Sequence, residues 1–230
     1  MKYSLVFLFL ATSCKLNAPT QQMEPTLVAG TYRYLALGDS YTIGESVAAD
    51  DRWPVQLADL LRKDQTSVAS PDIVARTGWT TAELATGIDG AKPAINYDLV
   101  SLLIGVNNQY RGQSLERYRT ELRELLLRCV QFADGRANRV LVLSTPDWGV
   151  TLFASGQNRA QIAREIDAFN QVQREECEKL KITLVDITPL SRTALGDASQ
   201  VASDGLHFSG KMYKQWAAAA LPVTKKMLAK

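Results

Sequence analysis

A serine, an aspartate and the single histidine of this 230-residue chain are of the types that acyl transfer requires. Ser40 follows a Gly-Asp turn near the start of the chain, whereas Asp204 and His207 lie three residues apart near its end. An imidazole that accepts the seryl proton makes the hydroxyl a nucleophile, and a neighbouring carboxylate holds that imidazole in the required tautomer. Taken singly, Ser40 is more typical of a helix cap, and an aspartate before a glycine is typical of a turn.

Short apolar segments alternate with helical patterns along the chain, and these elements must position the three residues. Strands are expected at residues 32–38, 72–75, 97–106, 139–144 and 182–187, and helices at 53–63, 80–87, 114–132, 160–181 and 210–220. This alternation predicts an α/β fold, a three-layer α/β/α sandwich around a doubly wound parallel five-stranded sheet.

Glycine-containing turns with polar residues follow three of the expected strands. Gly38-Asp39-Ser40 ends the first strand, Thr77-Gly78-Trp79 follows the second, and Gly105-Val106-Asn107-Asn108 follows the third. Functional groups in such folds gather at the carboxyl ends of the strands, so we expect these turns to converge. Gly78 and Asn107 taken singly would be ordinary turn residues.

Four blocks, around Ser40, Gly78, Asn107 and the Asp204–His207 pair, resemble in type and order the motifs of the SGNH, or GDSL-type, hydrolase family. The resemblance covers residues 32–221 and implies a flavodoxin-like sandwich that cleaves acyl esters without a metal or cofactor. It implies that Ser40 is the nucleophile and that His207, oriented by Asp204, is the general base. It further implies an oxyanion hole formed by the backbone amide of Ser40 with Gly78 and Asn107.

Two positions depart from the usual motifs of that family. Tyr41 stands where the first motif usually has leucine, which changes the packing behind the nucleophile but removes no catalytic atom. Asn108 stands where the third block typically has aspartate, a carboxylate that helps to order the loop. The resemblance therefore assigns a role to Asn107 and none to Asn108.

The substrate pocket is predicted from aromatic residues near the strand ends. Trp148 and Phe153 follow the fourth strand and Trp79 lies beside the oxyanion donors, although all three are equally consistent with ordinary packing. The partner is expected to be a small-molecule acyl ester. A carbohydrate acetylesterase, a non-catalytic lipid- or carbohydrate-binding module, and a flavodoxin-like flavin binder remain alternatives.

The amino terminus has the pattern of an export signal. Residues 1–13 contain Lys2, an apolar run and then three small residues before Cys14. Residues 14–30 resemble a solvated tether, and residues 31–230 are expected to form the domain. Cys14 directly follows the small residues, as in bacterial lipoprotein signals, although Ala11 stands where a branched residue is usual. A periplasmic or membrane-anchored lipoprotein is expected; a buried N-terminal strand is the alternative.

Composition excludes several other classes of protein. With 46% hydrophobic and 22% charged residues the chain is of globular composition, and a net charge of +2 is too small to attract nucleic acid. Three cysteines are too few for a disulfide framework and lack metal-ligand spacing. Cys129 and Cys177 could pair after export, but two buried free thiols are slightly favoured.

Overall fold

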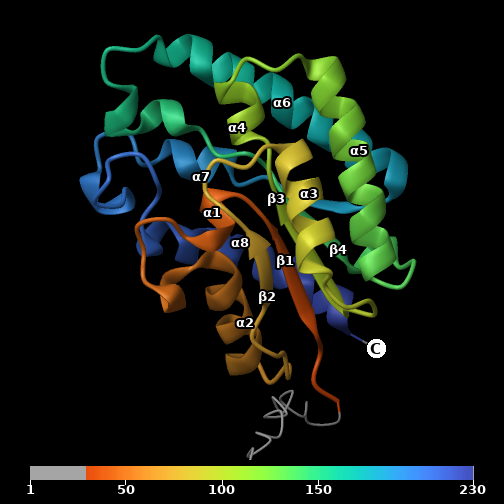
Figure 1. Ribbon diagram of the computed structural model, residues 1–230. Helices are drawn as coiled ribbons and strands as arrows, with labels where there is room; N and C mark the ends of the chain where they lie inside the picture. The colour runs from red at the N-terminus through yellow and green to blue at the C-terminus, as the bar shows by residue number, and fades with distance from the viewer. Residues whose placement is uncertain (1–29, 230) are drawn as a thin grey trace, which may run out of the picture.

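The computed structural model describes residues 30–229, which fold around one parallel sheet (Figure 1). The strands are β1 (Tyr34–Gly38), β2 (Asp72–Ala75), β3 (Leu99–Leu103), β4 (Val140–Leu143) and β5 (Thr183–Val185). Their order is β2-β1-β3-β4-β5, and every neighbouring pair is parallel. The predicted doubly wound five-stranded sheet is confirmed. The predicted signal segment, Cys14 and most of the tether lie outside the described residues.

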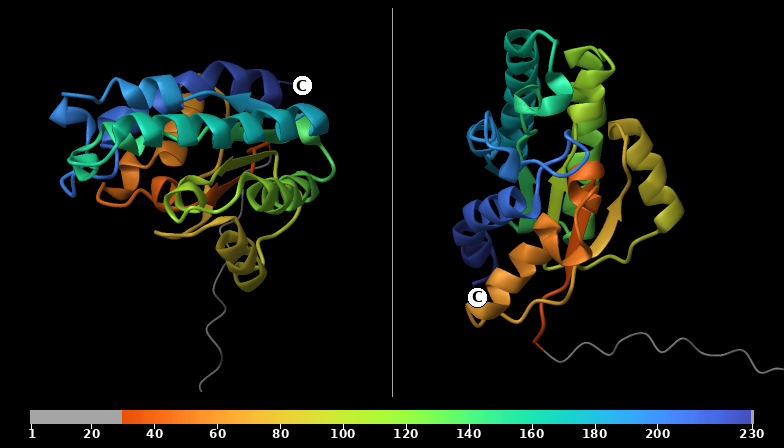
Figure 2. Two further views of the ribbon diagram at one scale, coloured as in Figure 1. Left: turned by 90° about the horizontal axis from the view of Figure 1, so that it is seen from above. Right: turned by 90° about the vertical axis from the view of Figure 1, so that its left-hand side faces the viewer.

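Helices cover both faces of the sheet, as the predicted three-layer sandwich requires (Figure 2). They are α1 (Ser40–Ile43), α2 (Trp53–Lys63), α3 (Thr81–Ala91), α4 (Val106–Tyr110), α5 (Leu115–Phe132), α6 (Arg159–Leu180), α7 (Thr188–Arg192) and α8 (Gly210–Leu228). Helices α2 and α8 pack together on one face, whereas α3 and α5 lie on the other with α6 beside α5. Within residues 30–229 no helix is long and apolar enough to cross a bilayer.

Burial on both faces explains why the central strands are almost entirely apolar; the exception, Ser101 of β3, is buried and its hydroxyl is hydrogen-bonded to the Tyr34 hydroxyl. In β1, Tyr34 and Ala36 pack in the core cluster shared with α2 and α8. Leu35 and Leu37 point to the opposite face and pack in the cluster shared with α3 and α5. Successive side chains of a strand alternate between the two faces, so a strand covered on both sides contains no polar stripe.

The helix boundaries follow local signals in some places and tertiary packing in others. Helix α3 begins with a capping box, in which the Thr80 hydroxyl accepts from the Glu83 backbone amide and the Glu83 carboxylate accepts from that of Thr80. Helix α8 begins after its cap Ser209 but continues eight residues past the predicted end at residue 220, through Pro222. Pro222 has no backbone hydrogen to donate to the carbonyl of Ala218, which lies on the exposed side of the helix.

Both described cysteines are free and buried, which agrees with the favoured alternative. They lie on α5 and α6, in the apolar cluster between these helices and the sheet. Burial raises the pKa of the Cys129 and Cys177 thiols to about 12. Neither thiol is therefore suited to act as a nucleophile near neutral pH.

Gly38 allows the close approach of α1 and β3 at the end of β1. A Cβ atom at this position would lie 2.2 Å from the Thr42 hydroxyl oxygen and 2.4 Å from the Leu103 carbonyl oxygen.

We expect Gly38→Ala to lower the free energy of unfolding by at least about 2 kcal/mol, measured by urea denaturation. The control is Gly90→Ala in α3, where a Cβ atom meets nothing within 4 Å and alanine should stabilise by about 0.5–1 kcal/mol. Equal effects of the two changes would contradict this account of Gly38.

Candidate active site

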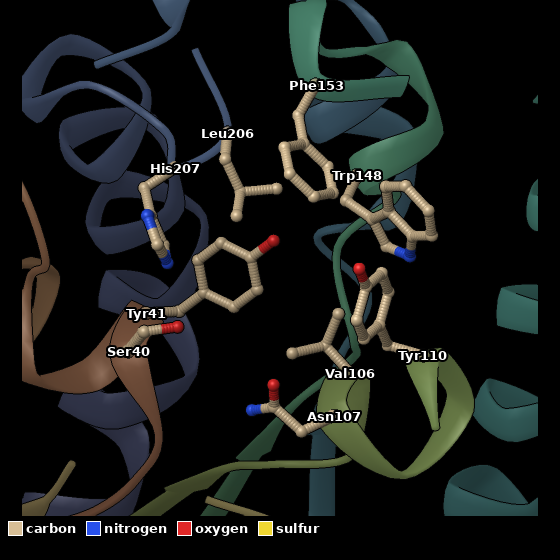
Figure 3. A pocket seen from close by; sticks show the side chains of 9 residues that line it. All are labelled: Ser40, Tyr41, Val106, Asn107, Tyr110, Trp148, Phe153, Leu206 and His207. Atoms are coloured by element: carbon tan, nitrogen blue, oxygen red, sulfur yellow. The ribbon is translucent and has the colours of Figure 1, made fainter. Parts of the chain in front are cut away.

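The order of the strands creates the crevice in which the site lies. The chain leaves β1 toward β2 on one side and reaches β3 on the other, so the loops after β1 and β3 diverge. Ser40 begins α1 directly after β1, and Asn107 lies in α4 directly after β3. Both line one cavity of about 130 Å³ (Figure 3).

Segments distant in the sequence complete the walls of this cavity. His207 and Leu206 come from the loop before α8, while Trp148 and Phe153 come from the loop after β4. The lining residues are Ser40, Tyr41, Val106, Asn107, Tyr110, Trp148, Phe153, Leu206 and His207 (Figure 3). The structure thus brings the predicted nucleophile and the predicted base into the same cavity, although 167 positions separate them in the sequence.

Ser40 is held at the start of a very short helix. Asp39 caps this helix, since its Oδ1 atom accepts from the Tyr41 backbone amide at 3.0 Å, and Gly44 ends the helix in the left-handed conformation. The Ser40 side chain is directed into the cavity, where Figure 3 shows it beside the imidazole of His207. Within residues 30–229 its hydroxyl makes no hydrogen bond, to His207 or to any other group, although both residues line the cavity.

His207 is oriented by the carboxylate of Asp204. Nδ1 of the imidazole lies 2.6 Å from Oδ2 of Asp204, and Oδ1 of the same carboxylate accepts from the His207 and Leu206 backbone amides at 2.9 Å. Ser46 donates to Oδ2 at 2.7 Å. A hydrogen on Nδ1 completes this arrangement and leaves Nε2 free to accept a proton.

Asp204 remains ionised in this environment. Burial opposes its ionisation, but hydrogen bonds from Ser46, His207 and the two backbone amides outweigh burial and hold the pKa of this carboxyl well below its usual range. A carboxylate that stays charged down to acid pH keeps the imidazole in one orientation throughout the neutral range.

Gly78 and Asn107 are linked through Trp79, which follows Gly78 in the segment between β2 and α3. The Asn107 Nδ2 group donates one hydrogen to the Trp79 carbonyl at 2.9 Å, which leaves its second hydrogen for another acceptor. Gly78 has a φ of +86°, which glycine adopts without strain, and its carbonyl accepts from Arg111 at 2.6 Å. Gly78 itself does not line the cavity.

A family model for GDSL-like lipases and acylhydrolases matches residues 36–215, which include Ser40, Gly78, Asn107, Asp204 and His207. The chain belongs to this family. It is therefore a hydrolase of ester bonds, and the resemblance stated from the sequence motifs is confirmed.

Several solved structures share the fold of this GDSL hydrolase. TesA has 17% identity and a TM-score of 0.68, with 85% of this chain and 99% of TesA covered. The psychrotrophic esterase EstA from Pseudoalteromonas sp. has 15% identity, a TM-score of 0.66 and coverage of 85% and 97%. Axe2, an acetylxylan esterase from Geobacillus stearothermophilus, has 19% identity, a TM-score of 0.66 and coverage of 85% and 95%. A comparison with curated proteins found no match.

Of the three aromatic residues predicted to line the pocket of the hydrolase, two do and one does not. Trp148 and Phe153 line the cavity, with their ring centroids 5.9 Å apart. Trp79 lies outside it, because its indole occupies the space above Gly87 of α3, where a Cβ atom would meet the ring at 2.1 Å. The absence of a side chain at Gly87 provides this alternative position for the tryptophan.

Asn108 has a structural role that the sequence did not indicate. It is buried, its Oδ1 atom accepts from the Thr81 backbone amide at 3.1 Å, and its Nδ2 group donates to the Thr81 hydroxyl at 2.6 Å. A carboxylate could accept such hydrogen bonds but could not donate one. Asn108 therefore fixes the loop after β3 to the start of α3.

Sequence reasoning also missed several residues that support or line the site. Ser46 donates to Asp204, Arg111 bonds the Gly78 carbonyl, and Tyr110 lines the cavity. No local motif marks the first two residues, because each acts on a partner that is distant in sequence. Tyr110 lies in α4, which at five residues is too short to show a helical period.

Asp39 supports a prediction about the pH dependence of stability. Burial raises the pKa of its carboxyl to about 7, even though the Tyr41 backbone amide donates to it, and its Oδ2 atom has no partner in the described part of the chain. An unfolded aspartate loses its proton near pH ~4, so between about pH 4 and 7 only the folded state holds this proton. Because the unfolded state releases this proton first, the free energy of unfolding falls as the pH rises through this range.

We expect Asp39→Asn to remove this contribution, because the amide is neutral at every pH and retains the oxygen that caps α1. Relative to the wild-type protein, the free energy of unfolding of the variant should rise by about 4 kcal/mol between pH 4 and 8. Urea denaturation of both proteins across this range measures the difference. A difference that does not change with pH would contradict the raised pKa of Asp39.

Proposed function

We propose that the protein is an exported serine esterase that cleaves carboxylic esters through an acyl-enzyme, with Ser40, His207 and Asp204 as its catalytic triad. The observation that carries this proposal is the convergence of Ser40 and the only imidazole on one cavity, with Nδ1 of that imidazole 2.6 Å from Asp204. His207 is the only histidine of the chain, so no other imidazole could accept the Ser40 proton.

In the first half of the reaction His207 Nε2 accepts the proton of Ser40 as the seryl oxygen bonds to the ester carbonyl carbon. The tetrahedral intermediate collapses when the bond from carbon to the alcohol oxygen breaks, and His207 returns the proton to the departing alcohol. In the second half a water molecule gives its proton to His207 and attacks the acyl-enzyme. The acid is released and Ser40 regains its hydrogen.

Three hydrogen-bond donors are proposed to stabilise the oxyanion: the backbone amides of Ser40 and Gly78 and the side-chain amide of Asn107. The proposal for Gly78, which does not line the cavity, is supported by its family motif alone. Ser40 is the first residue of α1, so its amide has no partner within the helix. The free hydrogen of Asn107 and its position on the cavity wall support its role. Loss of one such donor typically lowers kcat by roughly 10²- to 10³-fold.

The dimensions of the cavity favour a small acyl ester as the substrate. A volume of about 130 Å³ is close to that of an engineered cavity of roughly 150 Å³ that binds benzene. The exposed rings of Tyr110 and Phe153 at the mouth favour a second candidate, a carbohydrate acetylesterase, because aromatic rings pack well against sugars.

Replacement of the proposed nucleophile tests the triad. We expect Ser40→Ala to lower kcat/KM for p-nitrophenyl acetate by at least about 10⁴-fold, because Ser40 supplies the only seryl or threonyl hydroxyl among the residues that line the cavity. The matched control is Ser70→Ala, which removes an exposed hydroxyl before β2, at the opposite end of the sheet. Ester hydrolysis that survives in Ser40→Ala would contradict the assignment.

A phosphonate reagent separates an enzyme from a non-catalytic module, since only an activated hydroxyl reacts with it. EstA was crystallised as a form inhibited by monoethylphosphonate, which makes this a suitable probe. We expect one phosphonyl group on Ser40 of the wild-type protein, located by peptide mass spectrometry, and none in Ser40→Ala. An unreactive Ser40 would instead support the binding module.

The export proposal is tested by the mass of the mature protein. The basic and apolar pattern of residues 1–13 and the position of Cys14 support cleavage before this cysteine and attachment of lipid to it. Expression in a bacterium should yield a chain that begins at Cys14, carries lipid and partitions into detergent, whereas Cys14→Ser should not carry lipid. A full-length, unmodified mass would contradict both cleavage and anchoring.

A further inference from the structure

The ring of Tyr41 packs against the imidazole of His207. Its centroid lies 5.6 Å from that of His207, 5.8 Å from that of Phe208 and 6.0 Å from that of Trp216. Only 2% of Tyr41 is exposed, and that side chain lines the cavity. These contacts fix the direction of the phenol, and Figure 3 shows its hydroxyl directed into the cavity toward Trp148 and Phe153.

The hydroxyl of Tyr41 has no hydrogen-bond partner among the side chains and backbone of residues 30–229. The proposed mechanism does not use it, because Ser40, His207 and Asn107 already supply the reacting and oxyanion-binding groups. Trp148 is not available for another polar contact, since its indole nitrogen donates to Gln109 at 2.8 Å. The Tyr110 hydroxyl belongs to a side chain that is 55% exposed, where water can satisfy it.

The Tyr41 hydroxyl remains a neutral donor at every pH at which the enzyme would work. Burial, reinforced by the negative charges of Asp39, Asp147 and Asp204, raises the pKa of Tyr41 well above its usual value. A donor that keeps its hydrogen is suited to bind an acceptor oxygen of a ligand.

We propose that the Tyr41 hydroxyl determines specificity by donating a hydrogen bond to an oxygen that the substrate carries close to its scissile ester. The preferred substrates are esters with an ether or hydroxyl oxygen in the group that fills the cavity, rather than plain alkyl esters. This inference rests on the proposed esterase function, and it assigns a substrate-contacting role to the residue that replaces the usual leucine.

Because the cavity is small, a substrate group that fills it must lie next to the Tyr41 hydroxyl, which therefore affects the affinity for the substrate. A group that fills about 130 Å³ excludes solvent from the Tyr41 hydroxyl. An alkyl group would leave the phenol without a partner, and an unpaired buried donor typically lowers affinity by roughly 10- to 100-fold. An oxygen at the same position in the substrate restores the hydrogen bond.

The test compares two pairs of esters of nearly equal shape. The first pair, p-nitrophenyl methoxyacetate and p-nitrophenyl butyrate, differs in one oxygen of the acyl half. The second pair, 2-methoxyethyl acetate and butyl acetate, differs in one oxygen of the alcohol half. For each pair the selectivity is the kcat/KM of the ether-containing ester divided by that of its alkyl counterpart.

We expect Tyr41→Phe to lower this selectivity about tenfold or more for one pair, and the pair that responds identifies which half of the ester fills the cavity. Phenylalanine retains the packing on His207 and Trp216. Tyr41→Leu, which also lacks the hydroxyl, must give a loss of the same direction. The control is Tyr213→Phe, because Tyr213 also packs on Trp216, at 4.9 Å, but lies outside the cavity and should not change either ratio.

Selectivities that stay within twofold of wild type for both pairs in Tyr41→Phe would overturn the inference. An equal change in Tyr213→Phe would also overturn it, because the cause would then be packing. Failure of the proposed function has a different signature: ester hydrolysis is then absent from the wild-type protein or persists in Ser40→Ala.

Discussion

The hydrogen bond between His207 Nδ1 and the Asp204 carboxylate is the interaction on which the site depends. It determines which imidazole nitrogen faces the cavity, and Ser46 and two backbone amides hold the carboxylate in place. The loop that carries both residues is anchored by the start of α8 and by a bridge between Val201 and Phe208. The only histidine of the chain is thereby brought to the end of the first strand.

Much of the fold was predictable because its signals are local. The central strands are buried on both faces and read as continuous apolar segments, while α2, α5 and α6 have enough turns to show a helical period. The parallel sheet with helices on both faces then follows from the alternation of strands and helices. Ser40 and Asn107 could be placed in one crevice for the same reason, since each directly follows a strand.

The remaining features depend on contacts that no local pattern encodes. Trp79 lies outside the cavity because its ring packs on Gly87, eight residues later. The contact of Asn108 with Thr81, 27 residues earlier, had no local signal in the sequence. The short helices α1, α4 and α7 have too few residues to show a period, and they form where the ends of strands require a cap or a turn.

The claim that Ser40 and His207 act together is tested most directly by ¹⁵N NMR of the imidazole. The chain contains one histidine, so both ring resonances of labelled histidine come from His207 and only Nδ1 and Nε2 have to be distinguished. The account predicts that phosphonylation of Ser40 shifts the Nε2 resonance of His207. An Nε2 resonance that is unchanged in the phosphonylated protein would contradict the shared site.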